Sequence, residues 1–234
     1  LKNSGLFEVG PIYFGDKENE QVQCSAGIRS GQASVKHWSI GSREVDIYDT
    51  KKDAYKALES LGINTNSIFL NTNVPKWYHP GRSASINLGK NILGYFGELH
   101  PKYSENYGMR IVCFELFHNS LPTSHKKKTN KKFTSYSLMP IKRDFAFLTT
   151  KGTSSEEIIN AVKKSLSSIY YIDLLDINLF DIYSENLSSI NQKSLALEVV
   201  IQPNEKTLKD NEIVDITDLI VKGVQKDTNA ILRD

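Results

Sequence analysis

The sequence predicts an α+β protein of two separate domains, and three observations lead to that expectation. A run of five lysines in residues 126–132 divides the chain, and its neighbours offer almost nothing that could enter a core. Before that run, short apolar segments alternate with turn residues, as in an antiparallel sheet. After it, segments with the period of a strand alternate with segments with the period of a helix. We therefore place a first domain at residues 1–120, a lysine-rich linker at 121–136 and a second domain at 137–234.

The composition excludes several classes of protein. Of the 234 residues, 39% are hydrophobic and 24% are charged, which is typical of globular chains, and the net charge is only +2. Because a strongly basic nucleic-acid-binding protein is not indicated, any contact with nucleic acid must be local. The like charges of the linker favour a solvated connector, and contact with phosphates is the alternative interpretation.

Cysteine and histidine usage indicates no metal site and a reducing compartment. Cys24 and Cys113 lie far apart and no Cys-x-x-Cys pair occurs, so neither a disulfide framework nor a cysteine zinc site is suggested.

No run of about 18 apolar residues exists, and we expect a cytoplasmic protein with no membrane contact. The chain opens on Leu1 and enters a strand-like segment within a few residues, so we expect a fragment of a longer protein.

Six strand-like segments interrupted by two helices are expected in the first domain. One helix is predicted over Asp53 to Leu61, which sets Ala54, Ala57, Leu58 and Leu61 on one face, and Gly62 is a natural stop. A hairpin turn is expected at Leu88 to Asn91. The strands are expected at residues 6–14, 22–28, 67–70, 84–88, 92–97 and 111–117.

The second domain has the order strand, helix, strand, strand, helix, short strand. Ser154 and Glu157 have the spacing of a capping box at the start of the first helix. The second helix is expected over Asp210 to Thr228, with Asp210 or Thr207 as its cap. This order predicts a ferredoxin-like βαββαβ sandwich.

One face of this second sheet is expected to lie open to solvent. Strict alternation at 194–202 directs Leu195, Leu197, Val199 and Ile201 toward the helices, and Ser194, Ala196, Glu198 and Gln202 mostly away from them. By the same period, burial of Phe145 and Phe147 turns Asp144 and Ala146 outward, and burial of Phe180 and Ile182 turns Asp181 and Tyr183 outward.

These outward residues form a plausible platform for an unstacked base. Tyr183 could stack on the base and Asp181 could accept from a guanine edge. Ala146 and Ser194 leave room for the ring, and the Ser194 hydroxyl can donate or accept. Taken singly, a surface Tyr or Ser on a strand more often reflects β-propensity and solubility. The joint placement of the four residues is what favours a binding face.

Two ordered sets of motifs resemble one family. Near the C-terminus stand Arg143-Asp144-Phe145-Ala146, Phe180-Asp181-Ile182-Tyr183 and Lys193-Ser194-Leu195-Ala196; upstream stand His79-Pro80-Gly81-Arg82 and Gly94 to Pro101. Over essentially its whole length, the chain resembles the C-terminal part of the bacterial phenylalanyl-tRNA synthetase beta subunit. The resemblance implies part of a noncatalytic class II synthetase-like domain, with an antiparallel sheet and helices, followed by a ferredoxin-fold anticodon-binding module.

The resemblance also implies partners and site residues. The anticodon readers fall on Ala146, Asp181, Tyr183 and Ser194, and Lys206, where the family usually has Arg, is a possible phosphate contact. The intact enzyme pairs two alpha with two beta subunits and attaches phenylalanine to tRNA(Phe), using ATP and Mg on the alpha subunit. We therefore expect this part alone to be inactive, with no catalytic residue and no bound cofactor.

Two alternatives from other functional classes remain. The first is an autonomous nucleotide-using ligase with its site in residues 1–120, for which His79, Arg82, Glu98 and His100 are the available polar residues. Their simpler interpretation is loop and hairpin structure plus contacts to a partner subunit. The second alternative is a noncatalytic docking scaffold. Saturable ATP binding would favour the ligase, and tRNA that leaves the open face unprotected would favour the scaffold.

Overall fold

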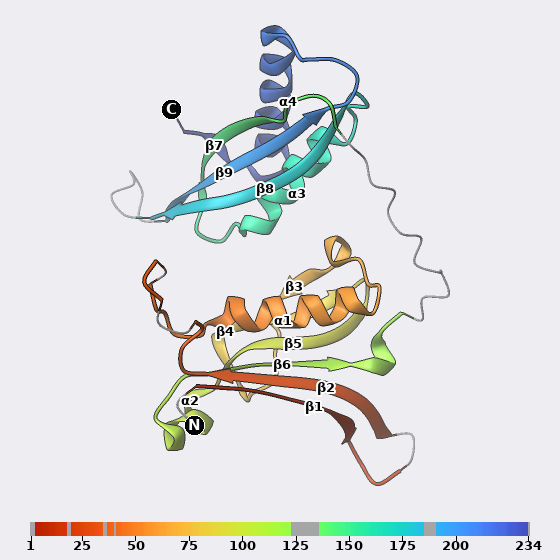
Figure 1. Ribbon diagram of the computed structural model, residues 1–234, viewed down its shortest axis with the longest axis vertical. Coiled ribbons are helices and arrows are strands. Elements are labelled where there is room, and N and C mark those ends of the chain that lie inside the picture. Colours follow the sequence, from red (N-terminus) through yellow and green to blue (C-terminus); the bar gives the residue numbers. More distant parts are fainter. Residues whose placement is uncertain are drawn as a thin grey trace. The chain divides into compact units, whose positions relative to one another are not determined.

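A computed structural model describes residues 3–17, 20–34, 37–39, 41–122, 136–184 and 191–233. The chain divides into two compact units, Leu1–Asn130 and Lys131–Asp234, which we call unit 1 and unit 2 (Figure 1). The linker expected at 121–136 falls almost entirely on residues 123–135, outside the described ranges, and its structure therefore stays a prediction.

Unit 1 is built on a six-stranded antiparallel sheet with the strand order β1-β2-β6-β5-β4-β3. All six predicted strands are confirmed, although β4 begins well before residue 84. Pro80 and Gly81 are unusual inside a strand, so the sequence did not predict the first residues of β4. A register shift between Tyr78 and Ser83 accommodates these two residues. The strands are β1 (Ser4–Tyr13), β2 (Gln21–Ser30), β3 (Phe69–Asn71), β4 (Tyr78–Leu88), β5 (Asn91–Leu99) and β6 (Ile111–Phe117).

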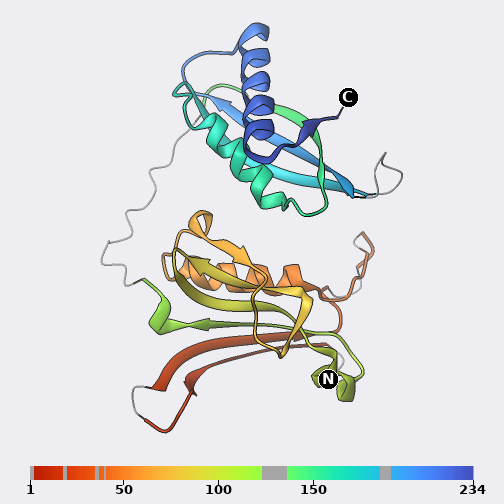
Figure 2. The same ribbon diagram turned by 180° about the vertical axis from the view of Figure 1, so that it is seen from behind.

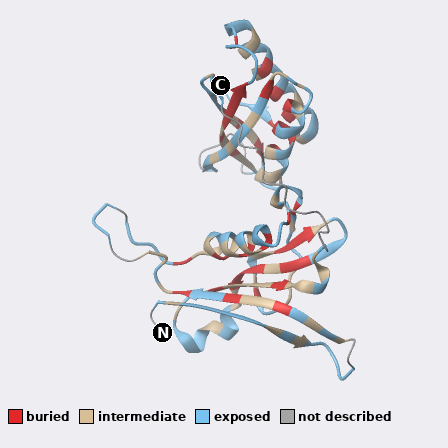
Figure 3. Cartoon of the chain, turned by 45° about the vertical axis from the view of Figure 1, so that its right-hand side comes forward, coloured by how far each residue is buried: buried red, intermediate tan, exposed pale blue. Residues whose placement is uncertain are grey.

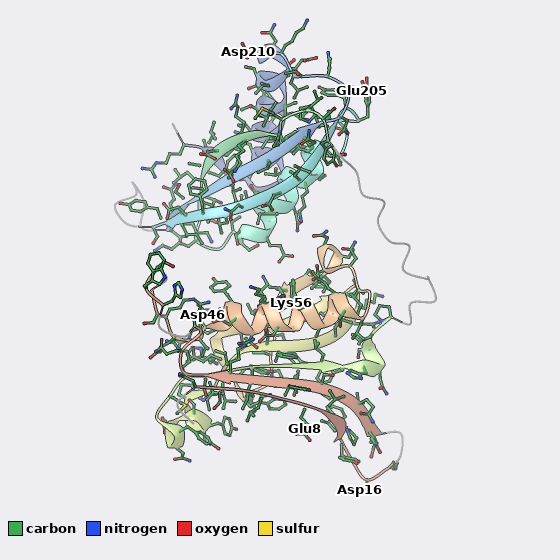
Figure 4. All side chains as sticks on the ribbon, viewed as in Figure 1. Glu8, Asp16, Asp46, Lys56, Glu205 and Asp210 are labelled. Carbon is green, nitrogen blue, oxygen red and sulfur yellow. The ribbon has the colours of Figure 1, made fainter. Side chains whose placement is uncertain are left out.

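Helix α1 (Ile47–Ser60) covers one face of this sheet. It begins six residues earlier than predicted because Asp46 caps it, as labelled in Figure 4, and Asp49 completes a capping box. The Arg43 guanidinium, which lies outside the helix, donates two hydrogen bonds to the Asp49 carboxylate and so stabilises the capping box. Ala54 and Leu58 enter the core as expected, whereas Leu61, expected on the same face, follows the last residue of the helix and is 53% exposed. The short elements are η2 (Thr65–Ser67), α2 (Pro101–Ser104), η3 (Glu105–Tyr107) and η4 (His118–Ser120).

Unit 2 has the predicted βαββαβ order, with sheet order β10-β7-β9-β8. Helices α3 and α4 lie on the same face of the sheet (Figure 2), and no helix of residues 136–184 and 191–233 lies on the other face. Ser154 and Glu157 form the predicted capping box. The elements are β7 (Ile141–Thr150), α3 (Ser155–Leu166), β8 (Ile172–Tyr183), β9 (Gln192–Pro203), α4 (Asp210–Thr228) and β10 (Ile231–Leu232).

The core of unit 2 lies between the sheet and the two helices (Figure 3). Phe145, Phe147 and the four apolar residues of β9 that were expected to face the helices are all buried. Gly223 allows α4 to approach α3, because a Cβ there would lie 1.9 Å from the Ser165 Oγ. The glycine that weakens the helix by propensity therefore has a packing reason.

Strand β8 departs from the predicted alternation. Phe180 and Ile182 were expected to be buried but are 55% and 56% exposed. A register shift between Leu179 and Asp181 inserts an extra residue, so the period of two breaks there. Ile182 still pairs with Leu195, but it lies near the end of an edge strand, where less protein covers it.

The predicted cap of α4 is also wrong. The helix begins at Asp210, and Lys209 holds the cap position, where its backbone N–H donates to the Glu212 carboxylate at 2.9 Å. No helix in the described part of the chain combines the length and apolar character that crossing a membrane requires.

Candidate nucleic-acid interface

The helix-free face of unit 2 brings the four predicted residues into two neighbouring rows. Ala146 of β7 pairs with Ala196 of β9, which pairs with Asp181 of β8. In the next row, Leu148 pairs with Ser194, which pairs with Tyr183. Because directly paired residues point to the same side, both rows share the face opposite Phe147 and Leu195. The shift in β8 thus restores the outward direction predicted for Asp181 and Tyr183.

Ser194 does not lie open to solvent as expected, since it is only 4% exposed. The C-terminal end of the chain explains why. Arg233 donates its backbone N–H to the Ala146 carbonyl at 2.7 Å, and its guanidinium carbon lies 5.8 Å from the centre of the Tyr183 ring. Since Ala146 is on β7 and Tyr183 on β8, this side chain spans the strand between them, where Ser194 lies.

Arg233 is therefore a site residue that the sequence reasoning missed. Its position depends on Asn229, which adopts a left-handed conformation with φ 55° and ends α4. The chain then runs antiparallel to β7, where Ile231 pairs with Leu148. A two-residue strand has no detectable period, so only the proximity of an arginine to the C-terminus could have drawn attention to it.

The opposite end of this face is covered by the segment that leads into β7. Gln202, expected to point outward, is 2% exposed because its side-chain amide donates to the Leu138 carbonyl at 2.9 Å. The Tyr136 hydroxyl donates to Asp173 on β8 at 3.0 Å. The accessible part of the face is therefore bounded by this segment at one end and contains Asp181 and Tyr183 at the other. We call this accessible part the open face.

Lys206, the predicted phosphate contact, is paired within the protein. Its ammonium lies 2.7 Å from the Glu212 carboxylate, and that hydrogen bond is the main reason why the pKa of Lys206 is raised. The pair is exposed and contributes little stability. Lys206 thus keeps its charge at the start of α4, and a phosphate contact stays a prediction.

The polar motif residues of unit 1 have structural contacts. Arg82 meets Glu98 through two nitrogens, at 2.8 and 3.2 Å, and Arg110 approaches the same carboxylate at 3.6 Å. The His79 Nδ1 accepts from the Gly81 backbone N–H, and the His100 Nδ1 accepts from the Lys102 N–H to cap α2. These contacts fix the turns and strand ends around β4 and β5.

Family models match both parts of the chain. Residues 1–117 match the model described as the phenylalanyl tRNA synthetase beta chain CLM domain, and residues 137–233 match that of the ferredoxin-fold anticodon binding domain. The chain belongs to the phenylalanyl-tRNA synthetase beta-chain family.

Similar proteins agree with this assignment. The chain is 35% identical to the phenylalanine–tRNA ligase beta subunit of Paramagnetospirillum magneticum and 36% identical to that of Rhodospirillum rubrum, over 100% and 98% of its length. The beta subunit of Ehrlichia ruminantium is 34% identical over 99% of the chain. In each case the chain spans 29% of the length of its relative.

The two family models assign the site residues of unit 1 and unit 2 to different domains of the family. All four predicted contact residues and Arg233 lie within the part that matches the anticodon-binding domain of this beta-chain family. The motif residues around Arg82 and His100 lie in the part that matches its CLM domain. The open face is therefore the candidate tRNA interface.

Proposed function

We propose that unit 2 binds the anticodon region of tRNA(Phe) through its open face, as part of a phenylalanine–tRNA ligase beta subunit. The observation that carries this proposal is the joint placement of Ala146, Asp181 and Tyr183 on one accessible face, beside Arg233, within a ferredoxin-fold anticodon binding domain. A single surface tyrosine would not support it.

Each residue has a distinct chemical task in this proposal. Tyr183 offers a ring on which a base stacks, and Asp181 accepts from the donor edge of a guanine. The Arg233 guanidinium carbon already lies 5.8 Å from the centre of the Tyr183 ring, so a base at that ring either displaces the guanidinium or lies between it and the ring. A displaced guanidinium would be free to meet a phosphate. Ser194 is only 4% exposed, so it contributes only if the side chains around it move when the RNA binds.

Catalysis is proposed to lie outside this chain, on an alpha subunit that uses ATP and Mg to attach phenylalanine to tRNA(Phe), in a cytoplasmic heterotetramer of two alpha and two beta subunits. A class II ATP site needs arginines free to hold a triphosphate. Arg82 and Arg110 instead both meet the Glu98 carboxylate. Because both arginines are paired with Glu98, they support a structural role for unit 1, including contact with a partner subunit. They do not favour the alternative of an autonomous ligase.

Titration with an anticodon stem-loop of tRNA(Phe), followed by backbone NMR, tests the proposal. The amides of Ala146, Asp181 and Tyr183 should shift saturably, while those of α1 in unit 1 should not. Shifts confined to α3 and α4, or none at all, would contradict the open face as the interface and favour the docking scaffold. A parallel ATP titration should leave the residues around Arg82 unchanged, and saturable shifts there would support the ligase.

A further inference from the structure

A second polar site lies on the sheet of unit 1, on the face opposite α1. Tyr95 on β5 and Glu115 on β6 are directly paired. Their neighbours Phe96, Phe114 and Leu116 pack in the core beneath α1. Because successive side chains of a strand point to opposite faces, Tyr95 and Glu115 project away from the helix. This location is separate from the open face of unit 2.

A series of four neighbouring aromatic rings begins at this carboxylate, to which Trp77 donates a hydrogen bond. The ring centres of Trp77 and Tyr78 are 6.4 Å apart, those of Tyr78 and Tyr95 6.1 Å, and those of Tyr95 and Phe117 5.6 Å. We call these four rings with Glu115 the aromatic cluster. Tyr78 is 3% exposed, whereas Trp77 is 47% exposed, so a solute can reach the cluster from the side of Trp77.

The negative charge of Glu115 has neutral partners. The Trp77 indole N–H donates to Oε1 at 3.2 Å, and the Tyr78 hydroxyl lies near enough to the carboxyl group to lower its pKa. Within the described residues, no Lys, Arg or His approaches this carboxylate, in contrast to Glu98, which meets two arginines. Burial raises the pKa of Glu115, as expected for a carboxylate without a cation beside it.

We propose that the aromatic cluster binds an organic ammonium ion. The electron-rich faces of aromatic rings attract a cation, most strongly where water is partly excluded, and Trp is the best of the three rings. A carboxylate offers about four lone-pair sites, of which the Trp77 indole uses one, so capacity remains for an ammonium N–H even with the Tyr78 hydroxyl nearby. Glu115 thus supplies the countercharge and the rings supply the walls. This site acts independently of tRNA binding.

The Trp77 indole N–H reports directly on occupancy, because it donates to the carboxylate that would meet the cation. We would titrate the chain with methylammonium chloride and with tetramethylammonium chloride, using NaCl at equal ionic strength as reference. The indole signal should shift saturably, with a midpoint of about millimolar to tens of millimolar for so small a ligand. Trp38, the only other tryptophan and 93% exposed, should not follow.

Matched variants separate a built site from a general surface charge. Glu115→Gln keeps the shape and should weaken binding about tenfold or more, because the countercharge is lost. Glu8→Gln removes an exposed carboxylate from the same face, two strands away in the row Glu8, Ala26, Glu115, and should bind as wild type (Figure 4). Tyr95→Leu, which removes one wall, should weaken binding about threefold or more.

The proposal is overturned if the Trp77 signal moves no more with ammonium ions than with NaCl, or if it moves in step with Trp38. It is equally overturned if a folded Glu115→Gln variant binds both ions with wild-type affinity. Should that variant not fold, Tyr95→Leu decides, and unchanged binding there would exclude the rings as walls.

Discussion

At the residue scale, the orientation of Asp181 follows from one irregularity in β8. The shift after Leu179 brings Asp181 opposite Ala196 and therefore onto the open face. Asp181 is exposed, and so is Asp176, which pairs with Val200 on the same side of the sheet. The two carboxylates differ in their distance along β8 from Tyr183, which makes Asp176 a suitable control.

Asp181→Asn should erode the preference for guanine at the first anticodon position. The carboxylate accepts from the guanine edge, whereas an amide places a donor there. Loss of a base-edge contact of this kind typically costs about 1–3 kcal/mol of discrimination, or roughly fivefold to a hundredfold. Affinities for stem-loops with guanine or adenine at that position give the ratio directly. Asp176→Asn should leave the ratio unchanged; an equal loss in both variants would argue against a base-edge contact by Asp181.

Glu115 should make the stability of unit 1 depend on pH in an identifiable direction. Burial raises the pKa of this carboxyl above its ordinary value of 4.5, so between those two pKa values the folded state binds more protons than the unfolded state. The free energy of unfolding should therefore fall as pH rises through that window. Glu115→Gln should remove this part of the slope, as measured by chemical denaturation from pH 4 to 8. Identical slopes in both proteins would show that the carboxyl titrates normally.

At the scale of elements, the spacing Gly94-x-x-Gly97 serves the packing of strands. A Cβ at Gly94 would lie 2.0 Å from the Glu115 carbonyl oxygen. Gly97 has φ 154°, and a Cβ there would lie 2.5 Å from the Ser83 Cα. Both glycines therefore allow β5 to approach the backbones of β6 and β4.

Gly97→Ala should destabilise unit 1 by about 1–3 kcal/mol or more, because the side chain meets backbone atoms that cannot rotate away. Gly5→Ala on β1 is the matched control, since nothing lies within 4 Å of its Cβ position. Thermal unfolding of both variants measures the difference. A Gly97→Ala protein as stable as the Gly5→Ala control would show that this close approach relaxes without cost.

Some strands and helix ends could be predicted from the sequence and others could not, for physical reasons. Strand β9 is flanked on both sides and keeps strict alternation, so the four apolar residues that face the helices were predictable, although Ser194 and Gln202 on the other face are buried as well. Strand β8 lies at an edge and contains shifts, which a period of two cannot anticipate. Helix α1 begins with Asp46 and Asp49, a pair that differs from the usual capping box and was overlooked.

The candidate site was predictable only in part for the same reason. Ala146 lies on the expected face because the alternation of β7 was sufficient to orient it, whereas Asp181 and Tyr183 lie on that face only because of the register shift in β8. The burial of Ser194 depends on Arg233, which is distant in sequence and held by the two-residue pairing of β10 with β7. Contacts of this kind follow from the path of the whole chain and leave no local pattern.

At the scale of the whole molecule, two separate units predict two separate products of limited proteolysis. Trypsin should cut first between Lys126 and Lys132, because a charged connector cannot be protected by a core, and should leave a stable piece that begins near Phe133. Mass spectrometry of early products identifies the site. Digestion of either unit before this lysine run would place the boundary elsewhere.

In the proposed binding of an anticodon to the open face of unit 2, the Tyr183 ring is the group on which a base stacks. Tyr183→Ala should weaken binding of the tRNA(Phe) anticodon stem-loop by about fivefold to more than a hundredfold, because stacking on one ring is worth about 1–3 kcal/mol. Tyr170→Ala, which removes the same side chain at a position 82% exposed outside β7, β8 and β9, should bind as wild type. A folded Tyr183→Ala protein that binds the cognate loop as tightly as the Tyr170→Ala control would contradict the proposed binding.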